Sequence, residues 1–201
     1  MKSHMLHRKK AGTLILFLAI GMSCYSQRFE AYAITGLTFS QIDGDNLAGY
    51  NNFGVMVGGA TNFILSNDFS FQQEIVYYQR GSRATEKELS NDVFTKKDLH
   101  YIDLIALINK TFNNKWLIQT GVGVGKLLWI GGDDVTDDTS YYSLDLFGAL
   151  GGGYFLTNNL LLNFRGQYTF SSTQKSIPWV HNNSIAIGLR WRFINKEDKN
   201  N

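Results

Sequence analysis

The 201-residue sequence contains little cysteine, proline or histidine: one Cys, one Pro and four His. The single cysteine, Cys24, excludes an internal disulfide. Only His100 and His181 lie beyond the first 26 residues, too few for most zinc sites. After residue 26 no apolar run approaches the ~20 residues that a transmembrane helix needs. These absences exclude a disulfide-stapled module, a typical zinc protein and a helical membrane protein.

The N-terminus has the three parts of a secretory signal. Basic residues precede an apolar core, Ala11 to Met22, and small residues follow it. Small side chains at Cys24 and Ser26 predict cleavage between Ser26 and Gln27. The apolar core of about a dozen residues is short for a membrane-spanning helix, so an uncleaved anchor is disfavoured. A lipidated Cys24 is a second alternative, but Gly21 stands where a lipoprotein signal normally carries Leu.

Removal of residues 1–26 changes the charge of the protein. The predicted signal carries four of the 19 Lys and Arg and none of the 17 acids. The mature chain therefore has 15 basic and 17 acidic residues, a formal charge of −2. A slightly acidic chain lacks the strongly basic surface that is typical of nucleic-acid binding, and we expect no nucleic-acid partner.

The segment Ser184 to Phe193 alternates without a break. Bulky apolar residues occupy one face, while the other begins with small residues and ends in Arg190 and Arg192. A period of two predicts a β-strand with different surroundings on its two sides. The apolar face suits lipid, and the polar face suits the interior of a barrel. Six aromatic side chains are expected in girdles at the membrane boundaries: Tyr77, Trp116, Trp129, Tyr168, Trp179 and Trp191.

Eight strand candidates follow the signal. Their connections alternate between tight turns rich in Asn, Asp and Ser and longer polar loops. This alternation is typical of an outer-membrane barrel, whose long loops face outward. We expect an all-β fold: an eight-stranded antiparallel up-and-down transmembrane β-barrel over residues 27–194, with a polar C-terminal tail at 195–201. The predicted strands are Phe29–Phe39, Phe53–Phe63, Phe69–Gly81, Leu99–Phe112, Trp116–Trp129, Tyr141–Leu156, Leu160–Phe170 and His181–Phe193.

The same alternation predicts which charged side chains point into the barrel. The inward faces collect three acids and three arginines, which should pair because an unpaired buried charge is costly. Asp145 and Arg165 lie on adjacent strands and are expected to be direct partners if their heights match. Because eight strands leave an interior filled by side chains, a structural plug is favoured over a polar channel or relay. The predicted interior charge cluster consists of Glu74, Asp103, Asp145, Arg165, Arg190 and Arg192.

Two further motifs suggest ligand sites only superficially. Gly121 to Gly125 lacks the spacing of a phosphate-binding loop, and alternating glycines in a strand make room for large neighbours. Asp133, Asp134, Asp137 and Asp138 form an acidic loop that matches no EF-hand, so a solvated loop is favoured over a Ca²⁺ site. We therefore expect no metal and no cofactor.

Several strand candidates resemble those of a known family. Ile34–Ile42 resembles the Gly-Leu-aromatic-Ser start of the bacterial outer-membrane β-barrel proteins called the porin family, or outer membrane protein β-barrel domain. Tyr101–Lys110 resembles their fourth strand, with Ile105 where a proline is usual. Leu144–Tyr154 and Leu162–Tyr168 resemble the sixth and seventh strands. The resemblance covers nearly all of the mature chain and implies an outer-membrane location, but the word porin does not establish transport.

The combined expectation is a monomeric, non-enzymatic outer-membrane barrel with a structural or interaction role through its long extracellular loops. Its expected partners are outer-membrane lipid, lipopolysaccharide and an unidentified extracellular partner. A narrow diffusion pore is one alternative, and a soluble lipocalin-like binder is another. A lipid-modifying barrel enzyme would need a histidine, a serine and an acid together on the lipid face. His100 falls on that face, whereas His181 begins a strand beside no evident catalytic partner.

Overall fold

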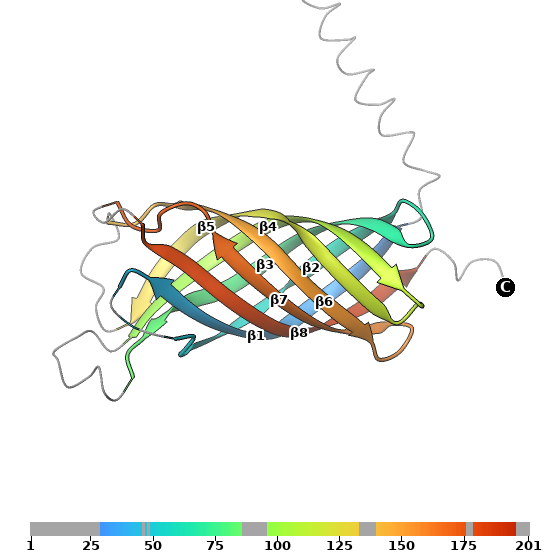
Figure 1. Ribbon diagram of the computed structural model, residues 1–201, viewed down its shortest axis with the longest axis horizontal. Coiled ribbons are helices and arrows are strands. Elements are labelled where there is room, and N and C mark those ends of the chain that lie inside the picture. The colour runs from blue at the N-terminus through green and yellow to red at the C-terminus, as the bar shows by residue number, and fades with distance from the viewer. Residues whose placement is uncertain are drawn as a thin grey trace, which may run out of the picture.

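A computed structural model describes residues 29–45, 47, 49–85, 96–132, 140–175 and 179–195. They form one closed barrel of eight antiparallel strands in sequence order, with β8 pairing to β1 (Figure 1). The predicted fold class is confirmed. Among the described residues, no helix is long and apolar enough to cross a membrane. The strands are β1 (Phe29–Asp43), β2 (Asn52–Ile64), β3 (Phe69–Arg83), β4 (Lys96–Phe112), β5 (Trp116–Gly132), β6 (Leu144–Phe155), β7 (Leu160–Thr169) and β8 (His181–Asn195).

Some of the predicted features lie outside the described residues. These are the signal peptide at 1–26 with Cys24, the acidic loop at 133–138, and residues 196–201 of the tail. The first residue assigned to that tail, Asn195, is the last residue of β8.

The strands differ from the predicted ones mainly at the end that carries the long connections. There β1 continues to Asp43 and β4 already begins at Lys96, in segments that we expected to be loop. Polar residues on both faces were the reason for that expectation, but a barrel wall can continue as a sheet where both of its faces are polar. In contrast, β6 begins only at Leu144, and Tyr141 forms an isolated bridge with Gln174.

The two ends of the barrel are built differently. Tight turns join β2 to β3, β4 to β5 and β6 to β7 at one end, and the longer connections lie at the other (Figure 1). In the turn between β4 and β5, Asn113 and Asn114 have φ angles of 50° and 54°, and the Lys115 amide donates to the Phe112 carbonyl oxygen at 3.0 Å. Asparagine adopts positive φ more readily than most residues, which explains this sequence at the turn.

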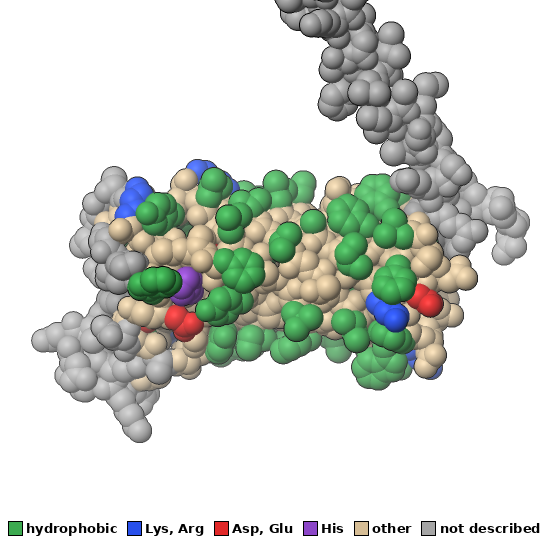
Figure 2. All heavy atoms as spheres, turned by 45° about the horizontal axis from the view of Figure 1, so that its top comes forward, with side chains coloured by type: hydrophobic (Ala, Val, Ile, Leu, Met, Phe, Trp, Pro, Cys, Tyr) green, Lys and Arg blue, Asp and Glu red, His purple; other side chains and the backbone are tan. Residues whose placement is uncertain are grey.

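The outer wall of the barrel is covered by exposed apolar side chains. Figure 2 shows them distributed along the wall between its two ends, and they include Leu104, Leu150 and Leu189. Aromatic residues lie towards each end of the strands, for example Trp116 at the turn end and Trp129 at the loop end. A continuous apolar exterior of this size has a large hydration cost in water and none in hydrocarbon.

Two glycines of the Gly121 to Gly125 segment in β5, Gly123 and Gly125, face the interior and leave room for neighbouring side chains, as predicted. A Cβ atom at Gly123 would overlap the ring of Phe147. Gly125 pairs with Asp103 on β4 and with Asp145 on β6, and a Cβ atom there would lie 2.6 Å from Asp103 Oδ1. The missing side chain at Gly125 therefore leaves room for the Asp103 carboxylate inside the barrel.

Candidate functional site

Five of the six predicted interior charges lie inside the barrel. Glu74, Asp103, Asp145, Arg165 and Arg190 are each at most 2% exposed. They come from five different strands and form two separate clusters, which differ in composition.

The first cluster, here the Arg80 cluster, contains Arg80, Asp103 and Asp145. The guanidinium of Arg80 forms ion pairs with both carboxylates, and its Nη1 lies 3.3 Å from Asp145 Oδ2. Asp145 also accepts hydrogen bonds from the hydroxyls of Thr169 at 3.1 Å and Ser171 at 3.0 Å. The two acids thus share a single arginine, which pairs with both of them but balances only one of their two negative charges.

Three aromatic rings surround the Arg80 guanidinium. Its Cζ atom lies 4.9 Å from the centroid of Phe147, 5.0 Å from that of Tyr101 and 5.1 Å from that of Tyr78. Cation–π contacts of this kind are strongest where water is excluded, and the Arg80 side chain is fully buried. The rings and carboxylates together hold Arg80 in one position.

The second cluster, here the Glu74 cluster, contains Glu74, Arg165 and Arg190. Arg165 binds Glu74 through two parallel hydrogen bonds, Nη1 to Oε2 at 2.6 Å and Nη2 to Oε1 at 2.8 Å. Arg190 Nη2 lies 3.0 Å from Glu74 Oε1. The planar fork of arginine matches a carboxylate in this bidentate geometry.

Amide side chains complete the Glu74 cluster. Asn163 Oδ1 accepts from Arg190 Nη2 at 3.1 Å, and Gln72 Nε2 donates to Glu74 Oε1 at 2.6 Å. These amides add hydrogen bonds to two atoms that already take part in the ion pairs, Arg190 Nη2 and Glu74 Oε1, and such added bonds offset part of the cost of burying the charges.

Arg192 does not join either cluster. It pairs with Glu30 near the turn end of the barrel, where its side chain is 16% exposed. Glu30 also accepts hydrogen bonds from Tyr32 Oη at 2.7 Å and Asn62 Nδ2 at 2.9 Å. The register explains the separation: Arg192 lies two residues nearer to the turn end of β8 than Arg190.

The expected pair between Asp145 and Arg165 is wrong. Although β6 and β7 are neighbours, Arg165 lies opposite Gly151 and not opposite Asp145. Asp145 sits six residues further towards the loop end, where it meets Ser171 and Arg80. The stagger between adjacent strands therefore separates two residues that share a face.

Sequence reasoning missed Arg80, the central residue of one cluster. The signal was present, because Arg80 has the same parity on β3 as the inward-facing Gln72, Glu74 and Tyr78. It was also missed that Glu30 would be the partner of Arg192. Both residues lie within the predicted strands, but the alternation was not followed beyond Tyr78 on β3 and was not applied to β1.

A polar cavity of about 830 Å³ occupies the turn end of the barrel. Its lining includes Asn62, Asn109 and Lys115, and it reaches inward to Gln72. Since Gln72 donates directly to Glu74, the Glu74 cluster lies just beyond the inner end of this cavity. The Arg80 cluster lies on the far side of the Glu74 cluster, towards the loop end.

The two histidines lie near the loop end, on the outer side. His100 stacks on Trp129 with ring centroids 4.2 Å apart, and its Nδ1 lies 2.6 Å from the Tyr77 hydroxyl. His181 Nδ1 lies 3.2 Å from the backbone carbonyl of Ser171, whose hydroxyl donates to Asp145. A nucleophilic serine would instead share its hydroxyl hydrogen bond with the histidine, so this arrangement does not form a catalytic relay.

Comparison with known proteins identifies the fold. No protein-family model matches the sequence, and no curated protein matches it. Neisserial surface protein A is 17% identical with a TM-score of 0.53, over 82% of this chain and 97% of that protein. Ail, the attachment invasion locus protein of Yersinia pestis, is 17% identical with a TM-score of 0.50, over 82% and 99%. At this level of identity the likeness concerns the fold, and it confirms the barrel architecture that the family resemblance implied.

Proposed function

We propose that the protein is an exported bacterial outer-membrane barrel with a plugged interior, which acts structurally or through its long loops. One observation carries the proposal: the outer wall is apolar along its length, while the interior is crossed by paired charges with at most 2% exposure. Only a hydrocarbon surrounding makes such an exterior favourable. An eight-stranded barrel leaves an interior that side chains can fill, which supports a plug.

Export would follow cleavage between Ser26 and Gln27, with lipid and lipopolysaccharide as the surroundings of the mature barrel. A role for the loops is supported by their length, since an outer-membrane barrel directs its long connections outward. Ail, which has a similar fold, is called an attachment invasion locus protein. That name is a precedent for an interaction role on this fold but no more, because one fold hosts many functions.

A narrow diffusion pore is the second candidate. The polar cavity at the turn end favours it, because such a cavity could form one end of a permeation path. Conductance separates the two candidates. The refolded barrel should show heat-modifiable mobility on gels, as folded outer-membrane barrels do, and no discrete current steps in planar lipid bilayers. Regular single-channel current steps from the unmodified protein would contradict the plugged barrel and support the diffusion pore.

The orientation of the barrel can be tested with single cysteines. Asn114 lies in a tight turn, and Lys175 lies in a long connection at the opposite end. In whole cells a membrane-impermeant thiol reagent should label Lys175→Cys and leave Asn114→Cys unlabelled until the outer membrane is opened. Labelling of Asn114→Cys in intact cells would reverse the proposed orientation.

A further inference from the structure

Gln73 is an exposed polar residue in the middle of the apolar outer wall. It lies four residues from Phe69, at the turn end of β3, and four residues from Tyr77, whose ring centroid is 6.1 Å from that of Trp129 near the loop end of β5. At about 3.3 Å per residue along a tilted strand, Gln73 is roughly 10 Å from Phe69 and from Tyr77, measured along the barrel axis. If the barrel spans a membrane as proposed, Gln73 therefore lies near the centre of the hydrocarbon layer.

The amide at this depth is unusual within the described part of the wall. The other outward positions midway along the described strands are apolar residues, glycines or threonines. A primary amide has two donors and an acceptor, and hydrocarbon satisfies none of them. A lipid-facing glutamine is therefore costly unless another polar group meets it inside the membrane.

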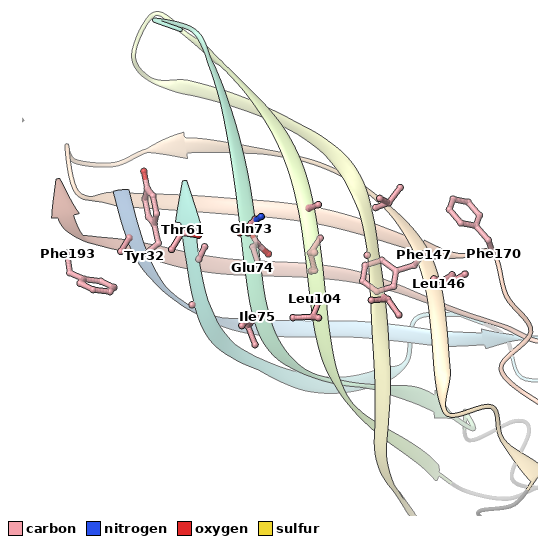
Figure 3. A pocket seen from close by; sticks show the side chains of 18 residues that line it. Tyr32, Thr61, Gln73, Glu74, Ile75, Leu104, Leu146, Phe147, Phe170 and Phe193 are labelled. Atoms are coloured by element: carbon pink, nitrogen blue, oxygen red, sulfur yellow. The ribbon is translucent and has the colours of Figure 1, made fainter. Parts of the chain in front are cut away.

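Small residues flank Gln73 on both sides. It pairs with Thr61 on β2 and with Ala106 on β4, and Gly59 lies one outward position further along β2. These residues belong to an open groove of about 940 Å³ in the wall, bordered by the larger side chains of Ile75 and Leu104 (Figure 3). A concave surface around a polar group allows the wall of a neighbouring barrel to approach closely, just as small residues allow close approach between membrane helices.

We infer that the face formed by Gly59, Thr61, Gln73 and Ala106 is a contact surface for a second copy of this chain, an inference that rests on the proposed membrane insertion. Two copies in one membrane have the same orientation, so a twofold axis along the membrane normal brings equal depths together. Gln73 then meets its own counterpart. An amide is self-complementary, because each can donate to the carbonyl oxygen of the other.

This inference revises the expectation of a monomer. A monomer is consistent with the backbone hydrogen bonding, since every strand of the closed barrel is already paired and no edge remains for strand addition. The dimer proposed here uses side chains alone. It leaves each barrel closed and its interior clusters unchanged.

Crosslinking through a single cysteine tests the contact. The one natural cysteine belongs to the predicted signal, so mature Gln73→Cys carries one thiol. Phe164→Cys is the matched control, because Phe164 is exposed midway along β7, four strands away around the barrel. In lipid vesicles at high dilution, mild oxidation should give a disulfide-linked dimer with Gln73→Cys and not with Phe164→Cys. Equal crosslinking at both sites would show that the disulfides form by random collision between barrels, and it would overturn the inference.

The association itself can be measured without a crosslink. Energy transfer between labelled copies in vesicles should report a dimer of the unmodified protein, and Gln73→Leu should weaken it roughly five- to tenfold. Phe164→Leu should leave it unchanged. Heat-modifiable mobility of the same samples shows whether the barrel has inserted. A barrel that inserts but stays monomeric at every protein-to-lipid ratio overturns the dimer alone, whereas one that does not insert overturns the proposed function.

Discussion

The two buried clusters are mirror images in charge. The Arg80 cluster places one guanidinium between two carboxylates, and the Glu74 cluster places one carboxylate between two guanidiniums. The Arg80 cluster alone has one negative charge in excess and the Glu74 cluster one positive charge in excess, so the two clusters together are neutral. The difference matters because a carboxylate can be neutralised by taking up a proton, whereas an arginine in a protein stays charged. The clusters should therefore fail in different ways when their central residue is removed.

The largest effect is expected from Glu74→Gln. This change keeps the shape of the side chain but strands two buried guanidiniums that cannot lose their charge. We expect a loss of about 4–5 kcal/mol, towards the upper end for broken buried ion pairs. Chemical unfolding of the refolded barrel, followed by tryptophan fluorescence, measures it. The loss should hardly change between neutral and mildly acidic pH, and a marked recovery on acidification would contradict the comparison.

Arg80→Met should be somewhat less harmful and should depend on pH. It leaves Asp103 and Asp145 buried without their cation, at a cost of about 3–4 kcal/mol near neutral pH. Burial then favours the protonated carboxyls, so the folded state binds protons more readily than the unfolded state. Stability of this variant should rise as the pH falls towards about 4. Unfolding curves measured at several pH values, with Glu74→Gln alongside, test this opposite behaviour.

The smallest effect concerns coupling between the clusters. In a double-mutant cycle, Asp145→Asn and Arg165→Met should show a coupling free energy below about 0.5 kcal/mol, because the two residues belong to different clusters. Glu74→Gln with Arg165→Met is the matched positive case and should couple by roughly 1–3 kcal/mol. A large coupling between Asp145 and Arg165 would mean that the clusters act as one unit.

The alternation of side chains made much of this structure predictable. It located all eight strands and identified Glu74, Asp103, Asp145, Arg165 and Arg190 as inward-facing, because a period of two relates each residue to a face. It could not assign partners. Glu74 on β3 meets Arg165 on β7, on the opposite wall, and that contact depends on the stagger that accumulates around the closed barrel. A local pattern contains no information on that stagger.

The separation of partners along the chain constrains how the barrel can assemble. Arg80 and Asp103 belong to one hairpin, so β3 and β4 could enter a membrane with this pair already formed. Glu74 lies on the same hairpin, but Arg165 follows it by 91 residues, on β7. A β3–β4 hairpin that inserted alone would expose the carboxylate of Glu74 to hydrocarbon until the last strands arrived. Insertion and closure must therefore proceed together, and partly inserted intermediates are costly for this chain.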